Sequence, residues 1–385
     1  MTTQSTQPGR QPARPARPAS SARAPLPGNR PSRHPAHPAL SRRALLAGTA
    51  AGAVGLGLAA CGRSGKTDSK TVTVVTHDSF HVSDDLIKAF TSETGYTLKV
   101  ATSGDAGALV NKLVLTKDAP LGDAVFGIDN TYATRALDQG VIDTSATVTL
   151  PQSAEGYVVA DTPALAPIDV GDVCLNIDTG YFAGKGLTPP ATFEDLTKPE
   201  YKGLLVAINP TNSSPGMAWL LATIGHFGAG SFADYWKQLT ANDARIAEDW
   251  TSAYETDFSA SGKGTYPVVV SYASSPSFTV SDDGASSSTS ALLDTAFRQV
   301  EYAGVLKGAA NPEGGKAFVE WMLSKAVQED IPGQMYMYPV LPDATLPEAL
   351  TKFGPLSIAP VNVDPKEITA NREKWLSTWT EAVGK

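Results

Sequence analysis

The sequence predicts an α/β protein built as two lobes around parallel strands. Short β-branched and apolar runs alternate with segments of helical apolar spacing, a pattern typical of a parallel sheet covered by helices. More than 300 residues remain after the amino-terminal signal described below, a length at which one core usually gives way to two. Two of the apolar runs end in the same Ser-Ser-Pro sequence, which indicates two strand ends facing one cleft.

Residues 1–60 are predicted to be an export signal and not part of the fold. Residues 1–43 contain eight arginines, nine prolines and no acidic residue, a composition that cannot build a core. Arg42 and Arg43 precede an uncharged apolar run, which favours twin-arginine export, with Sec export as the alternative. The run ends in Leu-Ala-Ala-Cys-Gly and resembles the lipobox of bacterial lipoproteins, which implies cleavage before Cys61 and acylation of its thiol. A plain membrane anchor is the alternative, and residues 61–70 are a polar tether.

Charge and cysteine content exclude several classes of protein. Removing the eight arginines of the signal takes the formal net charge from −8 to −16, which disfavours nucleic-acid binding. Cys174 has no partner besides the lipidation candidate, so we expect no disulfide and a buried thiol. The histidines outside the signal lack zinc-ligand spacing, so no metal site is expected.

The first lobe is expected to begin with three strands, each followed by a helix or a loop. The predicted strands are residues 71–76, 96–100 and 123–128, and the predicted helices begin at Ser83 and near Gly107. Asp105 stands just before the second helix, where it has the chemistry of an N-cap. The third strand runs into Asp129 and Asn130, expected to support the same edge of the sheet.

Two further apolar runs, residues 203–208 and 266–272, are each followed by a serine-rich segment. The apolar run 203–208 leads through a turn to Ser213, Ser214 and Pro215, a favourable start for the helix that follows. Such a helix start collects N–H groups and hydroxyls that attract an anion, although an ordinary capped helix is the alternative. The run 266–272 ends in the same chemistry at residues 274–276.

Six short blocks in a fixed order carry a family resemblance. They are residues 76–80 (THDSF), 127–130 (GIDN), 211–216 (TNSSPG), 250–254 (WTSAY), 270–276 (VSYASSP) and 337–340 (MYPV). Together they resemble the thiamine-binding periplasmic protein family, the substrate-binding component of a thiamine ABC importer. The resemblance covers nearly all of the chain after Lys70.

The resemblance implies a two-lobed type II periplasmic binding protein fold with two crossing strands at the hinge. The first lobe would comprise residues 71–168 and 302–385, and the second lobe residues 169–301. The crossings would lie at residues 167–177 and near 297–302. The helices after Pro312 and the carboxyl-terminal helix at residues 365–383 would belong to the first lobe. Their apolar and aromatic side chains are expected in the core, namely Phe318, Trp321, Met322, Trp375 and Trp379.

The same resemblance implies a set of ligand-binding residues. Asp105 and the backbone of Ala106 would contact the vitamin in the first lobe, while Ser213 and Ser214 would hold its tail. Trp250 and Tyr272 would supply aromatic faces for the thiazolium cation. His77 stands where the family commonly has tyrosine, and Tyr336 where it commonly has tryptophan. The second strand-end loop would complete the site with Ala273, Ser274 and Ser275.

The implied function is capture of thiamine or a thiamine phosphate outside the cytoplasmic membrane and delivery to an ABC permease and, through it, an ATPase. The protein would be a monomer without a cofactor, held by its lipid at the outer face of the cytoplasmic membrane. A same-fold binding protein for ferric iron, a polyamine or an oxyanion is the alternative. A hydrolytic enzyme is disfavoured because no Gly-x-Ser-x-Gly elbow surrounds a candidate serine.

Overall fold

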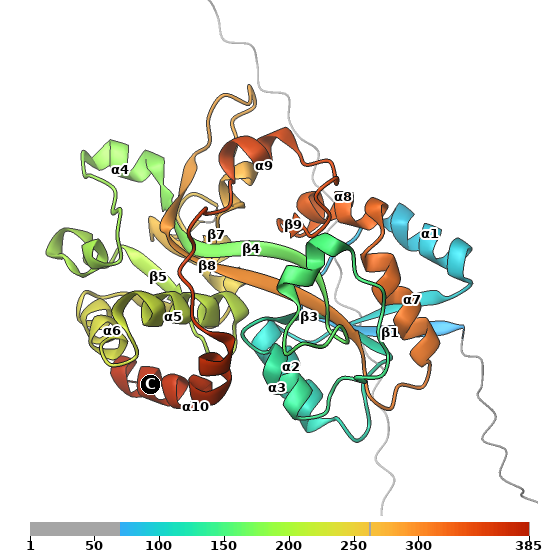
Figure 1. Cartoon of the computed structure of the whole chain (residues 1–385). Helices are drawn as coiled ribbons and strands as arrows, with labels where there is room; N and C mark the ends of the chain where they lie inside the picture. Colours follow the sequence, from blue (N-terminus) through green and yellow to red (C-terminus); the bar gives the residue numbers. More distant parts are fainter. Residues whose placement is uncertain (1–69, 262, 385) are drawn as a thin grey trace, which may run out of the picture. The chain divides into compact units, whose positions relative to one another are not determined.

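A nine-stranded sheet forms the frame of the protein (Figure 1). The computed structural model describes residues 70–261 and 263–384, so the export signal, Cys61 and nearly all of the tether lie outside the described residues. The strand order is β2-β1-β3-β8-β4-β7-β5-β6, and β9 pairs with β4. Within the described part of the chain, no helix is long and apolar enough to span a bilayer.

The sheet is parallel at both flanks and antiparallel at its centre. β1 pairs in parallel with β2 and β3, and β5 pairs in parallel with β6 and β7. The central strands β8 and β4 run against each other and against the neighbouring strands β3 and β7. The expectation of a parallel sheet therefore holds for the two flanks. The centre differs because the chain crosses there once in each direction.

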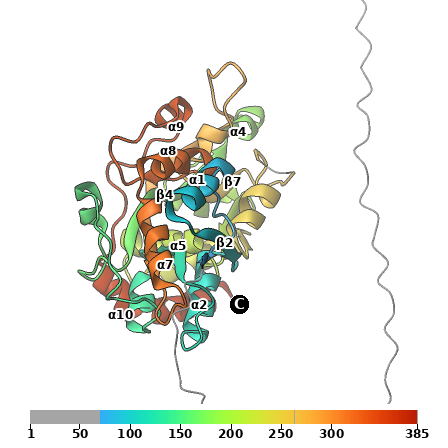
Figure 2. The same cartoon turned by 90° about the vertical axis from the view of Figure 1, so that its right-hand side faces the viewer.

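The elements of the first flank follow the predicted order. Asp105 caps α2, as expected from its position, by accepting a hydrogen bond from the backbone of Ala106. The bounds are β1 (Thr71–Thr76), α1 (Asp84–Thr94), β2 (Thr97–Thr102), α2 (Ala106–Leu115), β3 (Ala124–Asp129) and α3 (Ala133–Asp138). Figure 2 shows α1 and α7 on this side of the molecule.

The second flank carries the two strand-end loops. Ser213 caps α5, and Pro215 lies in the first turn of that helix. The bounds are α4 (Thr179–Lys185), β5 (Leu205–Ile208), α5 (Ser214–Phe227), α6 (Phe232–Ala241), β6 (Arg245–Ala247), the π-helix η4 (Ser252–Asp257), β7 (Val268–Tyr272) and the 3₁₀ helix η5 (Ser275–Phe278). The loop after β7 therefore opens a single short turn, whereas the loop after β5 opens a full helix.

Two long strands join the flanks. β4 (Ala166–Asp178) and β8 (Thr289–Val305) contain the two segments predicted to cross the hinge, and they pair along most of their length. β4 is buried almost throughout, and Cys174 lies in it fully buried, as expected. The lobe boundaries at residues 168 and 301 stay predictions.

The chain after β8 packs against both flanks. Its elements are α7 (Pro312–Met322), α8 (Lys325–Gln334), β9 (Tyr338–Pro339), α9 (Glu348–Phe353) and α10 (Pro365–Val383). α7 covers the first flank, and Phe318, Trp321 and Met322 are buried there as predicted.

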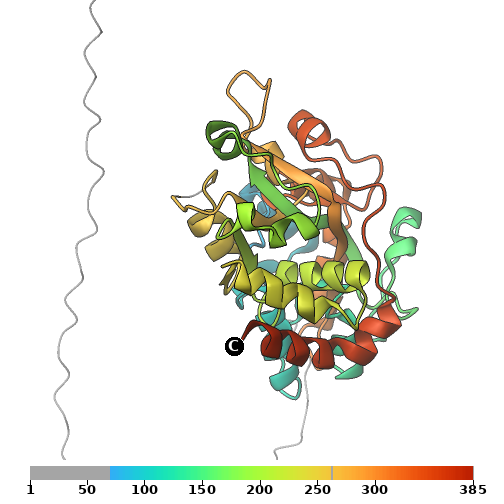
Figure 3. The same cartoon turned by 90° about the vertical axis from the view of Figure 1, so that its left-hand side faces the viewer.

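The carboxyl-terminal helix contacts both flanks. Near its start, Thr369 donates a hydrogen bond to Thr134 of α3, but Trp379 packs edge-to-face on Trp236 of α6, with 5.6 Å between ring centroids. Figure 3 shows α10 (dark red) beside the helices of the second flank. The second half of α10 therefore packs on α6 of the second flank, and the assignment of this helix to the first lobe stays a prediction that this packing does not favour.

Candidate functional site

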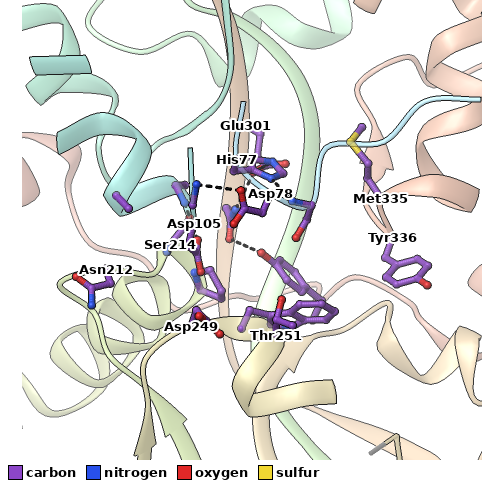
Figure 4. A pocket seen from close by; sticks show the side chains of 18 of the residues that line it. His77, Asp78, Asp105, Asn212, Ser214, Asp249, Thr251, Glu301, Met335 and Tyr336 are labelled. Carbon is purple, nitrogen blue, oxygen red and sulfur yellow. Dashed lines mark hydrogen bonds and ion pairs between the residues drawn. The ribbon is translucent and has the colours of Figure 1, made fainter. Parts of the chain in front are cut away.

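A pocket lies where strands of both flanks end. β1 and β2 lead directly to its residues His77 and Asp105, while β5 and β6 lead to Ser214 and Trp250. The cavity measures about 520 Å³, a size that suits a small-molecule ligand. Figure 4 shows His77 and Asp105 of the first flank close to Ser214 of the second. The strand ends that the sequence pointed to therefore meet at one site.

Seven of the eleven residues predicted to bind the ligand line this pocket. They are His77, Asp105, Ala106, Ser214, Trp250, Tyr272 and Tyr336. Ser213, Ala273, Ser274 and Ser275 are buried and do not line it. The two groups differ in what their side chains bond to.

Asp105 joins the starts of two helices from opposite flanks. Its Oδ1 accepts from the backbone N–H of Ala106, at 2.6 Å, and from that of Ser214, at 3.2 Å. Burial raises the pKa of Asp105, and hydrogen bonds from Ser213, Ser214 and Ala106 oppose that shift. This carboxylate acts as an internal anion at both helix starts. The cap and the pocket wall are thus the same side chain.

The serines before α5 are already engaged. Ser213 is fully buried, and its Oγ accepts from the backbone N–H of Gly216, because the N-cap geometry turns the hydroxyl into the helix. This geometry does not favour its contact with the ligand tail, which stays a prediction. Ser214 lines the pocket, but its Oγ donates to the carboxylate of Asp129. The anion site expected at this helix start is therefore filled by carboxylates of the protein.

The second strand-end loop lies behind the pocket wall. Ser275 Oγ lies 2.9 Å from Ser271 Oγ and accepts from the backbone N–H of Tyr272. Ser274 Oγ is buried and has no hydrogen-bond partner among the described residues. Ala273, Ser274 and Ser275 do not line the pocket, because the chain folds into η5 and these side chains are buried. Their contact with the ligand stays a prediction that this geometry does not favour.

Three aromatic side chains line the pocket. Trp250 stacks on Tyr254 with ring centroids 5.0 Å apart, and its Nε1 donates to Ser271 Oγ at 3.0 Å. Tyr272 donates to Gln299 Oε1 at 3.3 Å. Tyr336 adopts a positive φ of 64° on the opposite flank. Flat rings from both flanks can therefore contact one ligand.

His77 faces an acid at the floor of the pocket. Its Nε2 lies 3.3 Å from Glu301 Oε1, and its Nδ1 accepts from the backbone N–H of Ser79 at 3.1 Å. That acceptor role places the proton of the neutral ring on Nε2, next to the carboxylate. Burial lowers the pKa of His77, but Glu301, with Asp105 and Asp78, outweighs burial, so the pKa is raised.

Asp129 and Asn130 support the site as expected, from beneath it. Asp129 is fully buried, and burial raises its pKa to about 7 against the hydrogen bonds from Thr131. Asn130 bonds across to β8, where its Oδ1 accepts from the backbone N–H of Val300 at 3.1 Å.

The acidity of the lining was missed by the sequence reasoning. Six carboxylates line the pocket, and no lysine or arginine does so among the described residues. They are Asp78, Asp105, Glu248, Asp249, Glu255 and Glu301. Glu248 and Asp249 directly precede Trp250, a signal that was available, whereas Glu301 lies in a strand and shows no motif. Other lining residues outside the prediction include Asn212, Gln299, Gln334, Met335 and Met337.

Comparison with known proteins identifies the family. Residues 123–354, more than half of the chain, match the model of the bacterial extracellular solute-binding proteins. The chain belongs to this family. It is 27% identical to the thiamine-binding periplasmic protein of Escherichia coli (strain K12) over 324 residues, which cover 82% of this chain and 94% of that protein.

Solved structures of periplasmic binding proteins share the fold of this chain. A periplasmic thiamin binding protein superposes with a TM-score of 0.71 at 25% identity, covering 82% of this chain and 96% of that chain. Iron-bound HitA from Pseudomonas aeruginosa superposes with a TM-score of 0.63 at 20% identity, covering 81% and 99%, and shows the fold alone. The predicted resemblance and the two-lobed type II binding fold are both confirmed.

Proposed function

We propose that this solute-binding protein captures thiamine and delivers it to an ABC importer. The observation that carries the proposal is the pocket itself: an acidic cavity with aromatic walls from both flanks, in a chain similar over 82% of its length to thiamine-binding periplasmic proteins. A delocalised thiazolium cation is stabilised by aromatic faces and by nearby carboxylates. The aminopyrimidine finds acceptors among the same carboxylates.

Thiamine phosphates are a weaker match to this lining. A phosphate tail would find no lysine or arginine among the described pocket residues, and the start of α5 already holds Asp105. Its donors would be the remaining hydroxyls and backbone N–H groups. We therefore place the unphosphorylated vitamin first and its phosphates second.

Capture works by closure of the two flanks. Ser214 N–H donates to Asp105, and Ala108 N–H donates to Asn212 O at 3.2 Å, so bonds already connect the starts of α2 and α5. A ligand that contacts His77 and Trp250 at the same time gains contacts only when these flanks are together, and it therefore shifts the population toward the closed form. A permease of the importer would recognise that form, and its ATPase would drive release.

We propose that the protein is a binding protein and not an enzyme. Ser214, a pocket serine that could serve as a nucleophile, bonds to Asp129 instead of a histidine base. Export by a twin-arginine signal, acylation of Cys61 and a position at the outer face of the cytoplasmic membrane complete the proposal, together with a monomeric state. These features rest on residues 1–70 and on the family.

Polyamines are the second candidate, and one observation favours them. Six carboxylates around aromatic side chains resemble the surroundings that a flexible multivalent cation requires. Ferric iron is less favoured, because no group of three or more His, Cys, Asp or Glu side chains in the described part of the chain is placed to hold a metal ion.

Mass spectrometry of the ligand that co-purifies with undenatured protein tests the proposal most directly. We expect thiamine, and we expect dialysed protein to show quenching of tryptophan fluorescence when thiamine is added back. A co-purifying polyamine, or quenching by spermidine without any by thiamine, would replace thiamine with the second candidate. A visible charge-transfer band with ferric ion would point to iron.

A further inference from the structure

Three acids lie side by side across the centre of the sheet, below the pocket. The register of β3, β8 and β4 places Asp129 opposite Glu301, and Glu301 opposite Asp169. Glu301 lines the pocket, while Asp129 and Asp169 are completely buried. Paired residues on neighbouring strands point to the same side of the sheet, so the three carboxyl groups form a row.

Asp169 is the unusual member of the row. Neither of its carboxyl oxygens has a hydrogen-bond partner among the described residues. By contrast, Asp129 accepts from Thr131 and Ser214. A buried ionised carboxylate without any donor is strongly unfavourable, so Asp169 requires a proton of its own or a shared one.

Glu301 is the side chain that can share that proton. Burial raises the pKa of Asp169 well above its ordinary value, and the neighbouring Glu301 raises it further. An O–H group on one carboxyl donating to the other satisfies both acids, as in carboxyl pairs that hold one proton between them. His77, on the other side of Glu301, contributes its Nε2 at 3.3 Å.

The remaining charged and titratable groups around Glu301 are acidic or neutral. Asp129 faces it from β3, Asp105 and Asp78 face His77 from the first flank, and the phenol of Tyr272 lies on β7 with Gln299 beside it. None of these groups is a lysine or arginine. The proton and the ligand are therefore the available positive charges at this floor, apart from His77.

We propose that Asp169 and Glu301 hold one shared proton in the empty pocket and release it when a cationic ligand binds. The proposal rests on thiamine or another cation being the ligand. In the step, one carboxyl O–H bond breaks, the proton leaves to the solvent, and the ligand's positive charge takes its place beside the pair. No other bond changes. Asp169, which does not line the pocket, is a positioning residue that acts through Glu301.

The expected signature is proton release measured by calorimetry. Thiamine is titrated into the dialysed protein at pH 7 in buffers with different ionisation enthalpies, and the dependence of the heat on the buffer gives the number of protons released. We expect between about half a proton and one proton per thiamine, and an affinity that rises at least about threefold from pH 6 to pH 8. Asp169→Asn should abolish most of the release, whereas exposed Asp84→Asn should keep it.

Two results would overturn the proposal. One is binding of thiamine with no dependence on buffer, in which case the proposed function stands and the shared proton is refuted. The other is release that persists in Asp169→Asn and disappears in His77→Gln, which would place the proton on the imidazole.

A measurement without ligand separates this proposal from the proposed function. A carboxyl whose folded pKa is raised stabilises the fold at pH values below its ordinary pKa and loses that contribution as the pH rises through the raised value. The melting temperature of Asp169→Asn minus that of the wild type should therefore increase between pH 5 and pH 8. A difference that stays constant over this range overturns the shared proton even if thiamine fails to bind.

Discussion

The loop after β5 and the loop after β7 share the sequence Ser-Ser-Pro but differ in role. Each follows a buried strand and reads Ser-Ser-Pro, and the two strands are parallel neighbours. The first loop opens the 14-residue helix α5 and brings Ser214 to the pocket. The second opens one turn of 3₁₀ helix, and its Ser275 bonds to the strand that precedes it.

The difference comes from partners that are distant in the sequence. Ser214 meets Asp105 and Asp129, which lie on the opposite flank and more than 80 residues away in the chain. Ser275 has Ser271 and Tyr272 within reach and turns to them. In this protein a serine-rich strand end therefore reaches the pocket only where the opposing flank supplies a partner.

The largest effect should come from Trp250, an aromatic side chain that lines the pocket. Trp250→Ala removes an aromatic face from the pocket and should weaken thiamine binding by about 2 kcal/mol, roughly thirtyfold. Ser274→Ala removes a buried hydroxyl that has no hydrogen-bond partner among the described residues, so thiamine affinity should stay within about twofold. Calorimetric titration of both variants measures the difference. Equal losses would show that the second loop touches the ligand after all.

Substitution of two glycines should displace the two loops separately. A Cβ at Gly107 would lie 2.6 Å from the carbonyl oxygen of Asn212 in the first loop, and one at Gly354 would lie 2.9 Å from Ser274 Cα in the second. Overpacking of this kind costs about 1–3 kcal/mol. Gly107→Ala should weaken thiamine binding about tenfold, because it separates flanks that close together. Gly354→Ala should mainly lower the melting temperature.

Affinity and melting temperature measured on the same two samples decide this comparison. The contrast fails if Gly354→Ala weakens thiamine binding as much as Gly107→Ala does.

Local patterns predicted the elements well. The strand at residues 71–76 and the helix at residues 365–383 have the expected bounds, and Ser213 and Asp105 cap the helices they precede. Apolar run length, caps and prolines determine such features within a few residues. The antiparallel centre of the sheet was not visible locally, because it depends on how the crossing strands meet.

The site was predictable only in part for the same reason. Tyr272 and Trp250 follow strands and belong to recognisable blocks, so they were found. Glu301 and Asp169 gain their importance from register across β4 and β8, which no short motif encodes. The contact of the carboxyl-terminal helix with α6 was not visible in the sequence either, because the apolar face of the helix is the same whichever element covers it.

The smallest effect concerns the two serines as stabilising residues. Ser214→Ala removes one of the two hydroxyl donors of the buried Asp129 carboxylate, the other being Thr131, and should lower the free energy of unfolding by about 1–2 kcal/mol. Ser275→Ala removes a neutral hydrogen bond to Tyr272 N–H and should lower the free energy of unfolding by about 1 kcal/mol, both at pH 6 and at pH 8. Urea denaturation of both variants measures these costs.

The pH dependence of unfolding distinguishes the two serines more sharply than the size of either loss. The pKa of Asp129 is raised to about 7, so the stability that its protonated form contributes is present at pH 4 and is lost as the pH rises through 7. The Ser214 hydroxyl stabilises the ionised form, so its removal raises that pKa further and should cost more at pH 8 than at pH 6. The cost of Ser275→Ala should not change over this range, because Ser275 contacts no titrating acid. If both costs are independent of pH, the hydroxyl of Ser214 does not bond to an ionised Asp129, and the two loops differ in shape alone.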